Sequence, residues 1–102
     1  MIYVIATIDL APGTRSAFLA EFNKNLAAVR AEDGCIAYAP AIDAETGFPT
    51  QFKTGPDRVT VMEQWASVDA LKAHAVAPHM KTYRAATKEF VVGMELRVLS
   101  PA

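Results

Sequence analysis

The chain has 102 residues, of which 52 % are hydrophobic and 21 % charged, so it is expected to fold as a single domain over residues 1–102 and not to be disordered. Its formal net charge of −1, with no basic run, excludes the electrostatic footprint of a nucleic-acid-binding protein. Cys35 is the only cysteine, which excludes an internal disulfide and any site built from several thiolates.

The chain begins with an alternating pattern that predicts a β-strand. From Ile2 to Leu10 every second residue is apolar and shares one face, whereas the other face is mixed and carries Asp9. This pattern differs from the basic and then apolar start of a signal peptide, and no later apolar run is long enough to span a bilayer. We therefore expect a cytoplasmic protein with no membrane partner.

An amphipathic helix is predicted after the break at residues 11–13. Thr14 is expected to cap its N-terminus, and the apolar residues of the helix recur at spacings of four, four and three. Those residues are Phe18, Phe22, Leu26 and Val29. Gly34 is expected to supply the left-handed residue that ends the helix.

Two further strands are predicted at residues 35–42 and 58–65. In the second of these, one face carries Val59, Val61, Glu63 and Trp65. The connection at 43–57 is rich in glycine and proline and contains Phe48 and Phe52. Connections of this length are uncommon unless they are functional, so we expect a lid over a site or an arm across a dimer.

The last third of the chain predicts two helices and a final strand. Ser67 is a candidate N-cap for a helix ending near Ala77, Pro78 is suited to the first position of a helix running to about Thr87, and residues 90–99 form the strand. The resulting order is the ferredoxin-like β-α-β-β-α-β arrangement of an α+β protein.

A sheet with helices on one face leaves its opposite face in need of cover. The alternation assigns tyrosine, threonine, methionine, glutamate and tryptophan side chains to that uncovered face, which is too apolar for water and too polar for a core. We therefore expect a second copy of the chain to cover it, which makes the protein a homodimer.

Three residues are the main candidates for chemistry. If the helix after Trp65 folds back over the sheet, Trp65 and His74 reach one cleft, with His74 on the packed face of its helix. His74 is then either a proton-transfer group or a core histidine tied to a carbonyl or to Glu63. Glu63 is a candidate buried carboxylate in need of a partner, and Trp65 is either core or a flat wall for an aromatic ligand.

Tyr38 and Met62 are expected to add to that wall, or to serve packing alone. His79 shares a helical face with Tyr83 and is expected either to line the same cleft or to lie at the surface. The spacing of the two histidines fits no helical zinc motif, so no metal site is expected. The chain also lacks glycine-rich nucleotide motifs and a G-x-S-x-G elbow, so any redox chemistry must use the substrate's own electrons.

A sequence pattern in the second half of the chain resembles a known family. Glu63, Trp65, Ser67, Ala70-Leu71, His74 and Pro78-His79 follow the pattern E-x-W-x-S-x-x-A-L-x-x-H-x-x-x-P-H of the antibiotic biosynthesis monooxygenase family. Gly34-Cys35-Ile36-Ala37-Tyr38 is similar to its G-C-x-x-Y element. The resemblance extends over essentially the whole chain, is greatest to the quinol monooxygenase subgroup, and implies a dimeric α+β barrel.

By this resemblance, the activity is a cofactor-independent oxygenation by O₂ of a small electron-rich aromatic such as a hydroquinone or an anthrone. The resemblance implies that His74 is the base or oxyanion partner, that Glu63 orients an imidazole, and that Trp65 and Tyr38 are aromatic walls. His79, Tyr83 and Met62 are further substrate-binding candidates.

Two other functions fit the same residues. One is an isomerase of a small keto or enol compound, which would use the same base without oxygen. The other is a non-catalytic, small-molecule-binding, stress-associated dimer, because a fold alone does not settle function.

Overall fold

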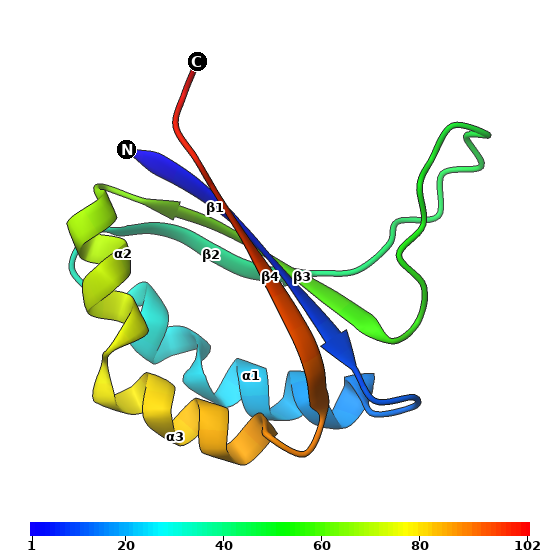
Figure 1. Cartoon of the computed structure of the whole chain (residues 1–102), viewed down its shortest axis with the longest axis horizontal. Helices are drawn as coiled ribbons and strands as arrows, with labels where there is room; N and C mark the ends of the chain where they lie inside the picture. The colour runs from blue at the N-terminus through cyan, green and yellow to red at the C-terminus, as the bar shows by residue number, and fades with distance from the viewer.

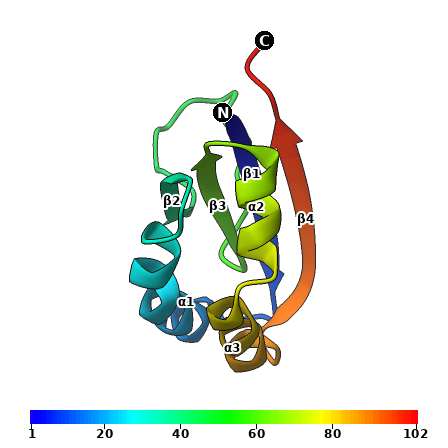
Figure 2. The same ribbon diagram turned by 90° about the vertical axis from the view of Figure 1, so that its left-hand side faces the viewer.

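The computed structural model describes all 102 residues as a four-stranded antiparallel sheet with three helices on one face (Figure 1). The strands lie in the order β2-β3-β1-β4, as Figure 2 shows from the side of α2. The elements are β1 (Ile2–Leu10), α1 (Arg15–Arg30), β2 (Cys35–Ala41), β3 (Arg58–Trp65), α2 (Val68–Ala75), α3 (Pro78–Thr87) and β4 (Val91–Leu99). The predicted α+β, ferredoxin-like arrangement is confirmed, with two helices, α2 and α3, between β3 and β4. None of the helices is both long and apolar enough to cross a membrane.

The alternation along the central strands decides which side chains meet the helices. β1 pairs with both β3 and β4, and Val4 lies opposite Glu63 on one side and Val98 on the other. Directly opposed residues share a face of the sheet, and the helix-facing residues of β1 and β3 are all buried. The expectation that the uncovered face carries the glutamate and the tryptophan is therefore wrong, because Glu63 and Trp65 alternate in phase with Val61 toward the helices.

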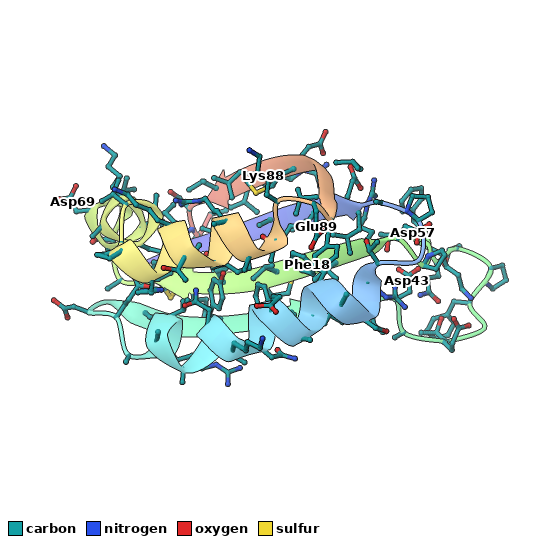
Figure 3. All side chains as sticks on the ribbon, turned by 90° about the horizontal axis from the view of Figure 1, so that it is seen from below. Phe18, Asp43, Asp57, Asp69, Lys88 and Glu89 are labelled. Atoms are coloured by element: carbon teal, nitrogen blue, oxygen red, sulfur yellow. The ribbon has the colours of Figure 1, made fainter.

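The core lies between the sheet and the helix pair α1 and α3. Phe18, Phe22 and Val29 of α1 are buried in it, as their spacing predicts. Figure 3 shows Phe18 in the layer between α1 and α3, and its ring centre lies 5.9 Å from that of Phe22 and 6.3 Å from that of Tyr83. This aromatic cluster packs α3 against α1.

All three helices start where the sequence predicts: Thr14 is the N-cap residue of α1, Ser67 is that of α2, and Pro78 is the first residue of α3. The Ser67 hydroxyl accepts a hydrogen bond from the Ala70 backbone N–H at 3.1 Å, and Pro78 occupies the first position of α3. Thr14 does not cap α1 with its side chain, because its hydroxyl donates instead to the Ala11 carbonyl at 2.7 Å.

Gly34 has a different role from the predicted one. α1 already ends at Arg30, and Gly34 adopts a φ of +83° in the turn that leads into β2. Its carbonyl accepts a hydrogen bond from the Ala66 backbone N–H at 2.8 Å. A Cβ at this position would lie 2.7 Å from the Ala70 Cβ of α2, so glycine is required both for the backbone conformation and for the close approach of α2.

Residues 42–57 form an arm that projects beyond the sheet (Figure 1). The Asp43 carboxylate closes its base by accepting hydrogen bonds of 2.9 Å from the Thr54 backbone N–H, the Thr54 hydroxyl and the Gly55 backbone N–H. Phe48 and Phe52 on the arm are 68 % and 83 % exposed. The arm contributes no residue to the hydrophobic core, so within one chain it is not a lid over that core.

The uncovered face of the sheet lies opposite the helices. Exposed apolar side chains from three strands lie on it, namely Tyr3, Met62 and Leu99. Met62 is 47 % exposed and lies between Ile5 of β1 and Ala39 of β2, near the centre of this face.

The Gly34 turn leads to a stability prediction with a matched control. Gly13 also has a positive φ, +77°, but a Cβ there would meet nothing within 4 Å. Gly13→Ala should therefore lower the free energy of unfolding by about 1–2 kcal/mol through backbone strain alone. Gly34→Ala should lower it by a further ~1–3 kcal/mol, because α2 must move away. Urea unfolding at equal protein concentration measures both, and equal losses would contradict the close approach.

Candidate active site

A cavity of about 580 Å³ lies between the sheet and helices α2 and α3. Its walls come from β1, β2, β3, β4, α2 and α3 and are mostly apolar. This volume and character suit a small aromatic molecule. The polar side chains that line the cavity are Tyr38, Glu63, His74, Tyr83, Arg84, Thr87 and Lys88.

His74 reaches the cavity from the packed face of α2. The residue is 6 % exposed, and its ring centre lies 4.7 Å from that of Trp65 and 5.5 Å from that of Tyr38. His74 Nδ1 lies 2.7 Å from Glu32 Oε2, a hydrogen-bond distance. Since Nδ1 is occupied by Glu32 and the ring lines the cavity, Nε2 is the nitrogen that can meet a molecule bound there.

Glu63 is buried beside this histidine but does not contact it through a hydrogen bond. Glu63 Oε1 accepts a hydrogen bond of 2.8 Å from Trp65 Nε1, and burial raises the pKa of the Glu63 carboxyl above its ordinary value. The prediction that Glu63 orients an imidazole is wrong, because the carboxylate on His74 belongs to Glu32. Glu63 instead anchors the indole against which the imidazole packs.

The aromatic residues divide into those that line the cavity and one that lies behind it. Trp65 is fully buried and lies outside the lining, so it supports His74 and does not form a ligand wall. Tyr38 lines the cavity and stacks on Phe22, with ring centres 5.6 Å apart, and Tyr83 lines it from α3. Burial raises the pKa of Tyr38, and raises that of Tyr83 to about 12, so both phenols remain protonated hydrogen-bond donors at neutral pH.

Two predicted ligand-binding residues lie outside the cavity. Met62 points to the opposite face of the sheet because it alternates with Glu63, so its predicted place in the aromatic wall is wrong. His79 is also absent from the lining. It lies beyond Glu32, with its Nε2 3.3 Å from Glu32 Oε2, and is therefore connected to the cavity through that carboxylate and not directly.

Glu32 is the site residue that the sequence analysis missed. Its side chain is 15 % exposed, and it follows the C-terminal end of α1, where the helix dipole disfavours a negative charge. That unfavourable position is the sequence signal that could have identified it, since residues that break a local rule often serve a site. No group of three or more His, Cys, Asp and Glu side chains has an arrangement that could hold a metal ion.

The chain is similar in sequence to a known protein family and to a curated relative. The profile of the antibiotic biosynthesis monooxygenase family matches residues 1–86. The chain is 42 % identical over 103 aligned positions to the probable quinol monooxygenase YgiN of Escherichia coli K12, with 99 % of this chain and 98 % of the relative covered.

Solved structures with similar folds include two from other bacteria. Rv0793 from Mycobacterium tuberculosis is 30 % identical with a TM-score of 0.78, covering 99 % of this chain and 94 % of the other. PA3566 from Pseudomonas aeruginosa is 25 % identical with a TM-score of 0.79, covering 99 % of this chain and 93 % of the other. The similarity to these two structures therefore extends over all the elements that build the cavity.

The raised pKa of Glu63 predicts a pH-dependent stability. The folded chain binds this proton more tightly than the unfolded chain, so native stability should fall as pH rises from the ordinary value of 4.5 through the raised pKa. Glu63→Gln still offers an oxygen to the Trp65 indole but has no charge to desolvate. The free energy of unfolding of Glu63→Gln relative to the native chain should therefore increase from pH 4.5 toward neutrality.

Urea unfolding followed by Trp65 fluorescence at several pH values measures this difference. The exposed Glu89, at the end of α3 (Figure 3), supplies the control substitution Glu89→Gln, which should follow the native curve. Parallel curves for the native chain and Glu63→Gln would contradict a desolvated carboxyl at Glu63.

Proposed function

Because the chain belongs to the antibiotic biosynthesis monooxygenase family, we propose that it oxygenates a small electron-rich aromatic, such as a hydroquinone or an anthrone, with O₂ and without a cofactor. The family resemblance in the sequence is confirmed by the match over residues 1–86. The quinol-type substrate is supported by the name of the relative that is 42 % identical over nearly the full length. The cavity volume of about 580 Å³ is compatible with one or a few fused rings.

One observation carries the mechanism. His74 lines an apolar cavity while its Nδ1 lies on the Glu32 carboxylate, so in the neutral imidazole Nε2 is the nitrogen that carries the lone pair and can accept a proton from a molecule in the cavity. This is the arrangement by which a carboxylate prepares a histidine for general base catalysis. His74 is thus the proposed catalytic base.

The proposed reaction begins with a proton transfer. The substrate O–H, or the activated C–H of an anthrone, breaks and its proton passes to His74 Nε2. The Tyr38 and Tyr83 hydroxyls, which line the same cavity and stay protonated, are suited to donate hydrogen bonds to the resulting anion. The anion then gives one electron to O₂, and the two radicals combine to form a carbon–oxygen bond.

The second half of the reaction returns the proton. The peroxide accepts it from His74, the oxygen–oxygen bond breaks, and the ring carbon loses its hydrogen to become a carbonyl. One oxygen atom remains in the product and the other leaves as water with two hydrogens from the substrate. The substrate is the reductant throughout, so the protein must only bind, deprotonate and stabilise charge.

We also propose that the protein acts as a homodimer through the uncovered face of the sheet. Tyr3, Met62 and Leu99 leave apolar surface on this face, and large exposed apolar patches mark interfaces. The exposed phenylalanines of the arm add apolar surface beyond the edge of the same sheet. Two sheets packed face to face would form the proposed dimeric α+β barrel.

Oxygen uptake with freshly reduced hydroquinones and anthrones tests the proposed function. The native chain should show saturable uptake, and His74→Gln should lower kcat/KM by about 10²–10⁴-fold because the base is lost. Lys72→Gln, an exposed change on the same helix, should leave the rate unchanged. Uptake no faster than the spontaneous rate for every compound would contradict the oxygenase, and turnover without oxygen would favour an isomerase.

The dimer has its own test. Met62→Glu places a charge at the centre of the uncovered face and should convert the dimer into a monomer, because an unpaired charge is strongly disfavoured in an apolar interface. Val76→Glu alters an even more exposed apolar residue on the helical side and should leave the dimer intact. Light scattering at micromolar concentration measures both masses, and a monomeric native chain would contradict the proposal.

A further inference from the structure

Glu32 Oε2 is the meeting point of both histidines of the chain. It lies 2.7 Å from His74 Nδ1 and 3.3 Å from His79 Nε2. His74 lines the cavity, whereas the His79 side chain is 27 % exposed on the outer side of Glu32. The three side chains therefore form a continuous path from the cavity toward the surface of α3.

Asn25 determines the tautomer of the neutral His79 ring. The Asn25 amide Nδ2 donates to Met80 Sδ at 3.4 Å, which leaves Asn25 Oδ1 facing His79 Nδ1 at 3.1 Å. An amide oxygen only accepts, so His79 Nδ1 carries the hydrogen. In the neutral ring, His79 Nε2 then carries the lone pair and lies 3.3 Å from Glu32 Oε2.

His79 Nε2 has no hydrogen-bond donor in the structure. His79 Nε2 is covered by protein and makes no hydrogen bond, because its approach to Glu32 has the distance but not the alignment of one. A buried nitrogen without a partner is unfavourable. A proton arriving at Glu32 from His74 would satisfy it.

We propose that Glu32 is the positioning residue of His74, and that His74, Glu32 and His79 form a proton relay out of the cavity. This inference rests on the proposed function, since it requires a proton taken from a substrate. The substrate proton binds His74 Nε2, the proton on His74 Nδ1 passes to Glu32 Oε2, and Glu32 passes it to His79 Nε2. The relay ends with His79 charged, Glu32 ionised and His74 neutral, and no electrons move within it.

The relay moves the positive charge from His74, which is next to the substrate anion, to His79. An imidazolium at His74 would return its proton to the anion, whereas a neutral imidazole N–H is a far weaker acid. The anion therefore persists long enough to give its electron to O₂. Reversal of the relay recharges His74 when the peroxide needs a proton.

Nitrogen NMR, which shows which ring nitrogens of His74 and His79 carry a proton, tests the relay with a bound phenol and without any turnover. para-Nitrophenol is the probe because its anion is coloured and because its para position is blocked against quinone formation. Binding to the native chain should produce the coloured anion and add a proton to His79 Nε2. In Glu32→Leu the His79 signal should not change on binding, while Glu21→Leu on the outer part of α1 should behave as the native chain does.

Turnover supplies the second readout. With a hydroquinone, Glu32→Leu should lower kcat about 10²-fold with little change in KM, because binding is intact while the base is misoriented. In the free protein, His74 should carry its hydrogen on Nδ1 in the native chain and on Nε2 in Glu32→Leu. The same His74 tautomer in both would overturn the positioning role.

The outcomes separate the relay from the proposed function. If the phenol binds as its anion and the released proton is found on His74 and not on His79, the relay is overturned, but the proposed oxygenase function is not. Failure of the phenol to bind overturns the aromatic cavity, and the relay with it. If Glu32→Leu does not fold, His79→Phe is used in its place. The relay is supported if the extra proton stays on His74 in this variant and reaches His79 in the native chain.

Discussion

The packing of the Trp65 indole on the His74 imidazole, with ring centres 4.7 Å apart, is the contact on which the site depends. It joins the end of β3 to α2 and holds the imidazole over the cavity. Trp65 is itself held by its hydrogen bond to Glu63, two residues earlier on the same face of the strand. The strand's period of two therefore supplies both the ring and the group that orients it.

The buried Glu63 and the partly buried Glu32 have different roles because they have different partners. Glu63 is tied to a neutral N–H donor and sits where burial raises its pKa. Glu32 lies against two imidazoles and keeps part of its side chain in contact with water. A carboxylate beside a basic ring can orient it and share its proton, whereas one beside an indole can only hold the indole in place. The chemistry of the site thus follows from which partner each acid has.

Local patterns in the sequence predicted the elements and the placement of His74 on the packed face of α2. The alternation of β3 and the Ser67 cap are properties of a few consecutive residues, so they can be recognised without the fold. The face that the helices cover is not a local property, which is why Glu63 and Trp65 were assigned to the uncovered side. The role of Gly34 depends on another element in the same way, since the Ala70 Cβ of α2 occupies the space that a side chain at Gly34 would need.

The partner of His74 could not be predicted from neighbouring residues. Glu32 lies 42 positions earlier, and only the close approach of the turn after α1 to α2 brings the two together. Glu63 was nearer in sequence and on a promising strand, so it was the natural but wrong choice. Ion-pair geometry between distant elements depends on helix lengths and crossing positions that a one-dimensional pattern does not contain.

An apolar cavity with a base at one side explains how a chain of this size can activate a substrate toward oxygen. The low polarity of the walls disfavours a free anion, so the anion forms only where donors compensate it. Tyr38 from β2 and Tyr83 from α3 both line the cavity, and burial keeps both hydroxyls protonated as hydrogen-bond donors. In the proposed reaction, these donors stabilise the substrate anion at the place where His74 takes up its proton, and the relay through Glu32 and His79 removes the positive charge that would otherwise remain on His74.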